Sequence, residues 1–153
     1  MATVDKAKLG NTSGIRDEMK RMLGQVPGWV NDMPEAALPG FWSMMRDFQL
    51  AETSIPCKYK ELIGLAVSGA TRCRYCALFH TEAARLNGAT DEEIAEASAM
   101  GGFTMMASTF LNAQQVDYDE FRKDTLEAIA YVRAQQGQPS RASSATTQAA
   151  GHA

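Results

Sequence analysis

Two cysteines and a histidine lie close together in the sequence, at spacings that suit thiol chemistry. Cys73 and Cys76 are three residues apart, and His80 follows Cys76 by four. On a helix these spacings place the thiols and the imidazole on one face, which we expect to point toward the protein interior with Phe79 and Ala83. Two cysteines on one helical turn can close a disulfide with little rearrangement. His80 can take the Cys76 proton, directly or through water, and so raise the fraction of thiolate that attacks a peroxide or a disulfide.

Cys73 lies near the expected start of this helix, and that position favours ionisation of its thiol. The unpaired amides and the dipole at a helix N-terminus stabilise a thiolate. Taken alone, this argument predicts a lower pKa for Cys73 than for Cys76. The spacing of His80 instead favours Cys76 as the thiol that transfers its proton to a base.

Glu61 is the last charged residue before a run of uncharged ones. The stretch Leu62 to Ala70 predicts a buried helix that carries Glu61 toward the core. A carboxylate there can orient or polarise the thiol–imidazole pair, and partial burial would raise its pKa. The alternative is an exposed ion-pair partner of Lys58 or Lys60, and the sequence alone leaves both readings open.

A structural zinc site is the main alternative for the cysteine pair. Such a site needs two more ligands, but the chain has two histidines, His80 and His152, and no second Cys-x-x-Cys pair. We therefore expect no metal. Considered without its neighbours, His80 would be interpreted as a core histidine with its hydrogen bonds satisfied. Cys57 has no partner at a useful spacing, and we expect a buried or incidental thiol there.

The composition of the 153-residue chain is that of a globular protein, with 45% hydrophobic and 22% charged residues. The net charge of −3, from 15 basic and 18 acidic side chains, indicates no broad basic surface, so we expect no nucleic-acid partner. Three cysteines do not complete the disulfide framework of a small secreted domain. The N-terminal stretch has no apolar run typical of a secretory signal, and we expect a cytoplasmic protein.

One uncharged stretch, Ala97 to Val116, could be mistaken for a membrane span. It contains serine, threonine, asparagine and glutamine, whereas a span of that length is more continuously apolar. We interpret it as a buried helix of a soluble protein, at a subunit contact, and we expect no membrane partner.

Start and stop signals predict an all-α protein, a helical bundle with no convincing strand, because no segment alternates apolar and polar residues. We expect a helical domain over residues 1–136 and a disordered tail over 137–153, which has no large apolar side chain. A break is expected at Leu38-Pro39-Gly40, a capping box at Thr90 and Glu93, and a bend or close contact at Gly101-Gly102. The expected helices are 13–25, 41–50, 56–70, 73–87, one following Thr90, and 118–135.

The residues Glu61, Cys73, Cys76 and His80, with their spacing, resemble the signature of the alkyl hydroperoxidase D-like (AhpD-like) branch of the carboxymuconolactone decarboxylase superfamily. The surrounding sequence is similar to that branch from about Pro56 to Asn112. The resemblance implies an all-α fold, trimers or hexamers of the chain, and a peroxidase or disulfide-reductase activity without a metal or bound organic cofactor.

The resemblance also implies a role for each of these residues. Cys76 would attack the peroxide and become a sulfenic acid, and Cys73 would resolve it to a disulfide and then face the reductant. His80 would take the proton from Cys76, with Glu61 supporting this relay. The reductant would be a dihydrolipoyl group on a carrier protein or a thioredoxin-like protein. One position departs from the best-known peroxidases of this branch, because Tyr75 stands where they carry a histidine.

Three functions are therefore compatible with the sequence. We expect a thiol-dependent peroxidase that reduces alkyl hydroperoxides or other peroxides through a Cys73–Cys76 disulfide cycle. Tyr75 motivates the alternative of a disulfide or organic-thiol oxidoreductase with little peroxidase activity. A third possibility is a non-catalytic oligomeric module whose thiols sense redox state or hold a metal.

Overall fold

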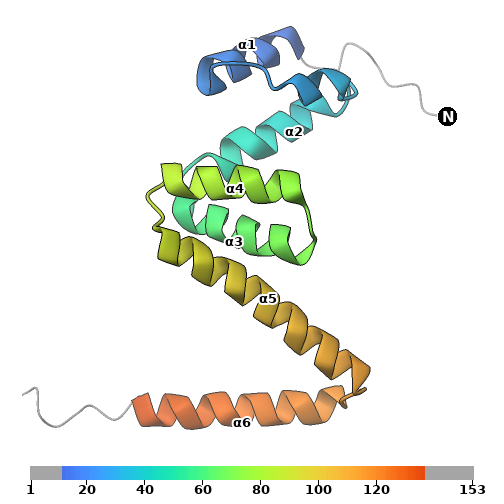
Figure 1. Cartoon of the computed structure of the whole chain (residues 1–153), viewed down its shortest axis with the longest axis vertical. Coiled ribbons are helices and arrows are strands. Elements are labelled where there is room, and N and C mark those ends of the chain that lie inside the picture. The colour runs from blue at the N-terminus through green and yellow to red at the C-terminus, as the bar shows by residue number, and fades with distance from the viewer. Residues whose placement is uncertain (1–11, 137–153) are drawn as a thin grey trace, which may run out of the picture. The chain divides into compact units, whose positions relative to one another are not determined.

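The computed structural model describes residues 12–136, and these form helices without any strand (Figure 1). The all-α prediction is confirmed. The expected disordered tail, 137–153, lies outside the described residues. The helices are α1 (Thr12–Leu23), the 3-10 helix η2 (Gly28–Asp32), α2 (Leu38–Met44), the π-helix η3 (Met45–Gln49), α3 (Cys57–Ala70), α4 (Arg74–Leu86), α5 (Asp91–Ala113) and α6 (Tyr118–Gln136). The chain divides into two compact units, the first ending at Thr104 and the second beginning at Met105.

The N-terminal part of the first unit has its own small apolar core. Met19, Val30, Leu38 and Trp42 are almost completely buried together. The Trp42 indole nitrogen donates a hydrogen bond of 2.7 Å to a Glu18 carboxylate oxygen, so this aromatic side chain is buried with its polar group satisfied.

The expected break at Leu38-Pro39-Gly40 is wrong, because α2 begins at Leu38 and includes all three residues. Proline is tolerated in the first helical turn, where its missing amide hydrogen has no intrahelical acceptor. The expected helix over 41–50 instead continues α2 and changes to π-helical geometry at Met45.

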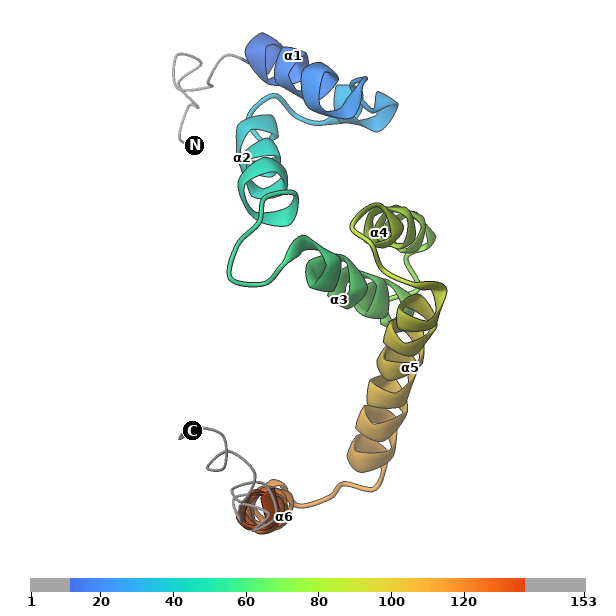
Figure 2. The same ribbon diagram turned by 90° about the vertical axis from the view of Figure 1, so that its left-hand side faces the viewer.

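Helices α3 and α4 form a helical hairpin in which the two helices lie side by side (Figures 1 and 2). Near its middle, α5 closely approaches α3, since a Cβ atom added at Gly101 would lie 2.6 Å from the Ala66 carbonyl oxygen. The close contact expected at Gly101 is therefore confirmed. The capping box is confirmed as well, by reciprocal hydrogen bonds of 2.9 and 3.1 Å between Thr90 and Glu93.

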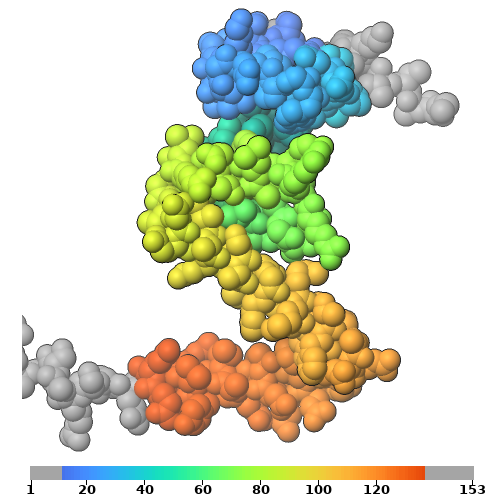
Figure 3. Space-filling model, in the orientation of Figure 1, coloured from blue at the N-terminus to red at the C-terminus, as the bar shows by residue number. Residues whose placement is uncertain are grey.

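No side chain of α6 is buried, and its apolar residues Phe121, Leu126, Ile129 and Val132 are all exposed. Figure 3 shows the atoms of α6 in orange and red. The expectation that Ala97 to Val116 is buried is wrong for the single chain, because within α5 only Gly101 is buried. None of the described helices is long and apolar enough to cross a membrane.

Candidate active site

The turn between α3 and α4 places Cys73 at the start of α4. Arg72 has a φ of +58°, a left-handed conformation that glycine or asparagine adopts more readily. The Cys73 amide then donates to the Ser68 carbonyl at 3.0 Å, and the Thr71 amide donates to the Val67 carbonyl at 2.9 Å. These bonds end α3 and reverse the chain within three residues. As a result, α4 begins directly after Cys73.

Cys73 is the N-cap residue of α4, and its half-buried sulfur accepts a hydrogen bond of 3.3 Å from the Cys76 amide. Hydrogen bonding from the Cys76 thiol and amide lowers the pKa of Cys73 below its ordinary value, although partial burial opposes the shift. The same thiol interaction raises the pKa of Cys76, and burial adds to that rise. The sequence argument that the helix start favours a lower pKa for Cys73 agrees with this geometry.

His80 and Glu61 join α4 to α3 at the centre of the hairpin. The His80 Nδ1 atom lies 2.6 Å from a Glu61 carboxylate oxygen, and the Glu61 side chain is only 1% exposed. The burial expected for Glu61 is confirmed, and the exposed-partner alternative is wrong. When the carboxylate accepts a hydrogen bond from Nδ1–H of a neutral imidazole, Nε2 carries the lone pair that can accept a proton.

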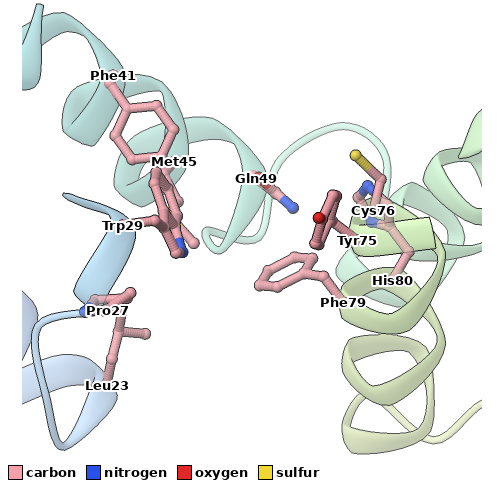
Figure 4. A pocket seen from close by; sticks show the side chains of 10 residues that line it. All are labelled: Leu23, Pro27, Trp29, Phe41, Met45, Gln49, Tyr75, Cys76, Phe79 and His80. Carbon is pink, nitrogen blue, oxygen red and sulfur yellow. The ribbon is translucent and has the colours of Figure 1, made fainter. Parts of the chain in front are cut away.

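Cys76 and His80 line one apolar cavity of about 360 Å³ (Figure 4). Helix α4 contributes two further aromatic side chains, Tyr75 and Phe79, and Figure 4 shows their rings on the α4 side of the cavity. The residues from preceding elements are Leu23, Pro27, Trp29, Phe41, Met45 and Gln49. This second set was not predicted from the sequence, because its members are scattered along the chain with no motif spacing.

The prediction that both thiols face the interior with the imidazole is wrong for Cys76, which is exposed, whereas Cys73 and His80 are half-buried. Phe79 is also exposed, at 39%. Ala84 is the fully buried residue of α4, and Cys76 lies about 80° around the helix from it. Cys76 therefore borders the cavity rather than the contact with α3.

His80 also lines a second apolar cavity, of about 410 Å³, with Gly64, Ile63 and Phe48 among its other residues. Lys60 borders this cavity, but its ammonium group is engaged by the carbonyl oxygens of Phe48 and Ala51, each at 2.5 Å, and by the Thr53 hydroxyl at 3.2 Å. These bonds occupy the hydrogen-bond donors of the Lys60 ammonium group.

Cys57 is buried at the start of α3, away from the cysteine pair in the sequence, and its thiol donates to the Leu50 carbonyl at 3.5 Å. Burial raises its pKa above the ordinary value. The expectation of a buried thiol is confirmed. Within residues 12–136, no three histidine, cysteine, aspartate or glutamate side chains are grouped closely enough to hold a metal ion.

The sequence model of the carboxymuconolactone decarboxylase family matches residues 36–114, slightly more than half of the chain. The chain belongs to this family. The matched segment spans the hairpin and starts upstream of the residues that carried the resemblance. No curated protein matches the chain at a significant level.

Among solved structures of similar proteins is the alkylhydroperoxidase AhpD core from Rhodospirillum rubrum. It is 32% identical to the chain, with a TM-score of 0.61, and the alignment covers 78% of this chain and 96% of that one. The predicted placement as an AhpD-like member of the family is confirmed.

Proposed function

We propose that this family member is a thiol-dependent peroxidase that uses Cys73 and Cys76 as a redox pair. The observation that carries the proposal is the arrangement of Cys76 and His80 on one apolar cavity, with His80 bound to the buried carboxylate of Glu61. A nucleophile beside a base, and a third group that orients the base, is the arrangement expected for an activated nucleophile.

In the proposed oxidative steps, His80 accepts the Cys76 proton and the thiolate attacks the distal oxygen of a hydroperoxide. The O–O bond breaks, Cys76 becomes a sulfenic acid, and the departing alkoxide takes a proton from His80 and leaves as the alcohol. The Cys73 thiolate then attacks the Cys76 sulfur and the S–O bond breaks. The leaving hydroxide takes a proton equivalent to the one that Cys73 has lost and departs as water. The hydrogen bonds that lower the pKa of Cys73 support its role as the resolving thiolate.

A dithiol, such as a dihydrolipoyl group or the cysteine pair of a thioredoxin-like protein, is the proposed reductant. It returns both cysteines to thiols and is itself oxidised to a disulfide. The proposal needs no metal or bound organic cofactor, and it places the reaction in the cytoplasm. The exposed apolar side chains of α5 and α6 support a homo-oligomer, a trimer or hexamer, which light scattering of the purified protein would measure.

The test is to reduce the protein fully, add one equivalent of hydrogen peroxide or an alkyl hydroperoxide, and map the cysteines by mass spectrometry within seconds. We expect rapid formation of a Cys73–Cys76 disulfide while Cys57 remains a free thiol. Slow oxidation spread over all three thiols would contradict the proposal.

A disulfide or organic-thiol oxidoreductase is the second candidate, and Tyr75 favours it. Its ring is 73% exposed and its hydroxyl accepts a hydrogen bond of 3.1 Å from Arg74, so the position offers no second imidazole to the thiols. Fast reduction of a small disulfide with negligible peroxide consumption would select this candidate.

A further inference from the structure

The imidazole of His80 lies directly against the backbone of α3 at Gly64. A Cβ atom added to Gly64 would lie 2.5 Å from Nδ1 and 2.7 Å from Nε2 of the His80 ring. Both separations are well below van der Waals contact, so the ring occupies the space that any other residue at position 64 would need for its side chain. Glycine in a helix interior is less stable than alanine. The need to make room for the His80 ring explains why α3 has a glycine at this position.

A second glycine of the same helix shows that this crowding is specific to one position. No heavy atom lies within 4 Å of a Cβ added at Gly69. An alanine at Gly69 would therefore gain helix propensity without meeting a neighbour, whereas an alanine at Gly64 would meet His80.

The ring is also held by Glu61, which precedes Gly64 by three residues and so lies one turn away on the same helix. Because the contact between His80 Nδ1 and the Glu61 carboxylate is short, at 2.6 Å, a methyl group that pushes the ring outward lengthens or breaks it. His80 and Gly64 both border the second cavity, which provides room for the displaced ring. The expected response to an alanine is therefore a movement of the imidazole rather than unfolding of the hairpin.

We propose that Gly64 is a positioning residue, whose missing side chain forms the seat that keeps the His80 imidazole against α3 and in contact with Glu61. The proposal rests on the proposed function, because it assigns Gly64 a part in preparing the base for Cys76. Gly64 acts through His80 and has no contact with the reacting atoms in this scheme.

The experiment compares Gly64→Ala with the matched control Gly69→Ala in the full chain. Imidazole ¹⁵N signals report the tautomer and protonation of His80, and the substitution His152→Gln assigns them because the chain has two histidines. We expect Gly64→Ala to shift the His80 signals and their pH profile, and to slow disulfide formation with an alkyl hydroperoxide by about tenfold or more. Gly69→Ala should leave both unchanged.

If Gly64→Ala folds poorly, the same substitution is tested in a chain that lacks the His80 ring. In His80→Ala, the space is vacated, so adding Gly64→Ala should raise the melting temperature as Gly69→Ala does. An equal loss of melting temperature from Gly64→Ala with and without the His80 ring would overturn the proposal.

Two further outcomes distinguish the positioning role of Gly64 from the proposed peroxidase activity. The positioning role would be contradicted if the His80 signals and the oxidation rates of Gly64→Ala were identical to those of the parent chain. The parent chain could instead fail to react with peroxide while Gly64→Ala still shifts the His80 signals. That result would support the positioning role and contradict the peroxidase proposal.

Discussion

The α3–α4 hairpin and the helix α6 differ in how far their side chains are buried and bonded. In the hairpin, Glu61 is buried and bonded to His80, and a hydrogen-bonded turn joins the two helices. Gly64 of α3 lies directly against the His80 ring of α4. Helix α6 buries no side chain, and even its apolar residues Ile129 and Leu126 are each more than half exposed. The comparison teaches that contacts within the first unit hold the proposed reaction centre, whereas the apolar side chains of α6 are exposed in the described chain.

The largest effect is expected at the hairpin's reactive sulfur. Replacement Cys76→Ser should abolish peroxide turnover, because serine can form neither the sulfenic acid nor the disulfide. Peroxide consumption measured with excess dithiol checks this, with Cys57→Ser as the control that retains activity. Full activity of the Cys76→Ser protein would exclude the proposed cycle.

The next effect tests the contact between His80 and Glu61 at the centre of the hairpin. In Glu61→Gln the side chain keeps its shape but loses its charge, so His80 loses the carboxylate that orients and polarises it. We expect the rate of disulfide formation to fall by roughly 10²-fold, at the lower end of what a positioned base contributes. Stopped-flow oxidation measures the rate, and a circular dichroism spectrum matching that of the parent would show that the fold is retained.

Stability measurements can sharpen the contrast between the two regions. Leu65, in α3, is 6% exposed, and Leu65→Ala should reduce the free energy of unfolding by about 2–5 kcal/mol. For Ile129→Ala, in α6, we expect a loss that grows with protein concentration, because any stabilisation by Ile129 comes from association. Thermal unfolding at several concentrations distinguishes the two, and an Ile129→Ala effect independent of concentration would contradict an intermolecular role.

A pH series separates the three thiols. Hydrogen bonds lower the pKa of Cys73, so its alkylation rate should rise at a lower pH than that of an ordinary cysteine. Cys76 and Cys57, whose pKa values are raised, should follow only at higher pH, and Cys57 should remain slowest because it is buried. Iodoacetamide labelling followed by peptide mass spectrometry gives the order, which would be reversed if Cys76 held the more acidic thiol.

The smallest effect is expected at the turn that joins the hairpin. Arg72 adopts a left-handed conformation that costs a non-glycine residue roughly 1–2 kcal/mol. Arg72→Gly removes that cost but increases the entropy of the unfolded chain, so we expect a net gain of no more than about 1 kcal/mol. Urea unfolding measures the difference, and Arg72→Val should instead destabilise the protein.

The helix pattern and the core of the site were predictable because they depend on local rules. Glu61 is buried as its place before an uncharged stretch indicates, and the Thr90 capping box has a recognisable spacing. The expectation that the whole stretch from Leu62 to Ala70 is buried is wrong, because Ile63 and Val67 are more than half exposed. The orientation of Cys76 was not predictable, because it depends on how α4 is rotated about its axis against α3. Trp29 and Phe41 also escaped prediction, since their approach to the cavity depends on tertiary packing that no local pattern records.

Trp29 gives the molecule an optical signal of its own. It is 55% exposed and lines the cavity with Cys76, whereas the chain's other tryptophan, Trp42, is buried against Glu18. Occupancy of the cavity, or a new bond at Cys76, therefore changes the surroundings of one indole and leaves the other as a constant reference. In a Trp42→Phe protein the intrinsic fluorescence would follow events in the cavity in real time, without an added dye.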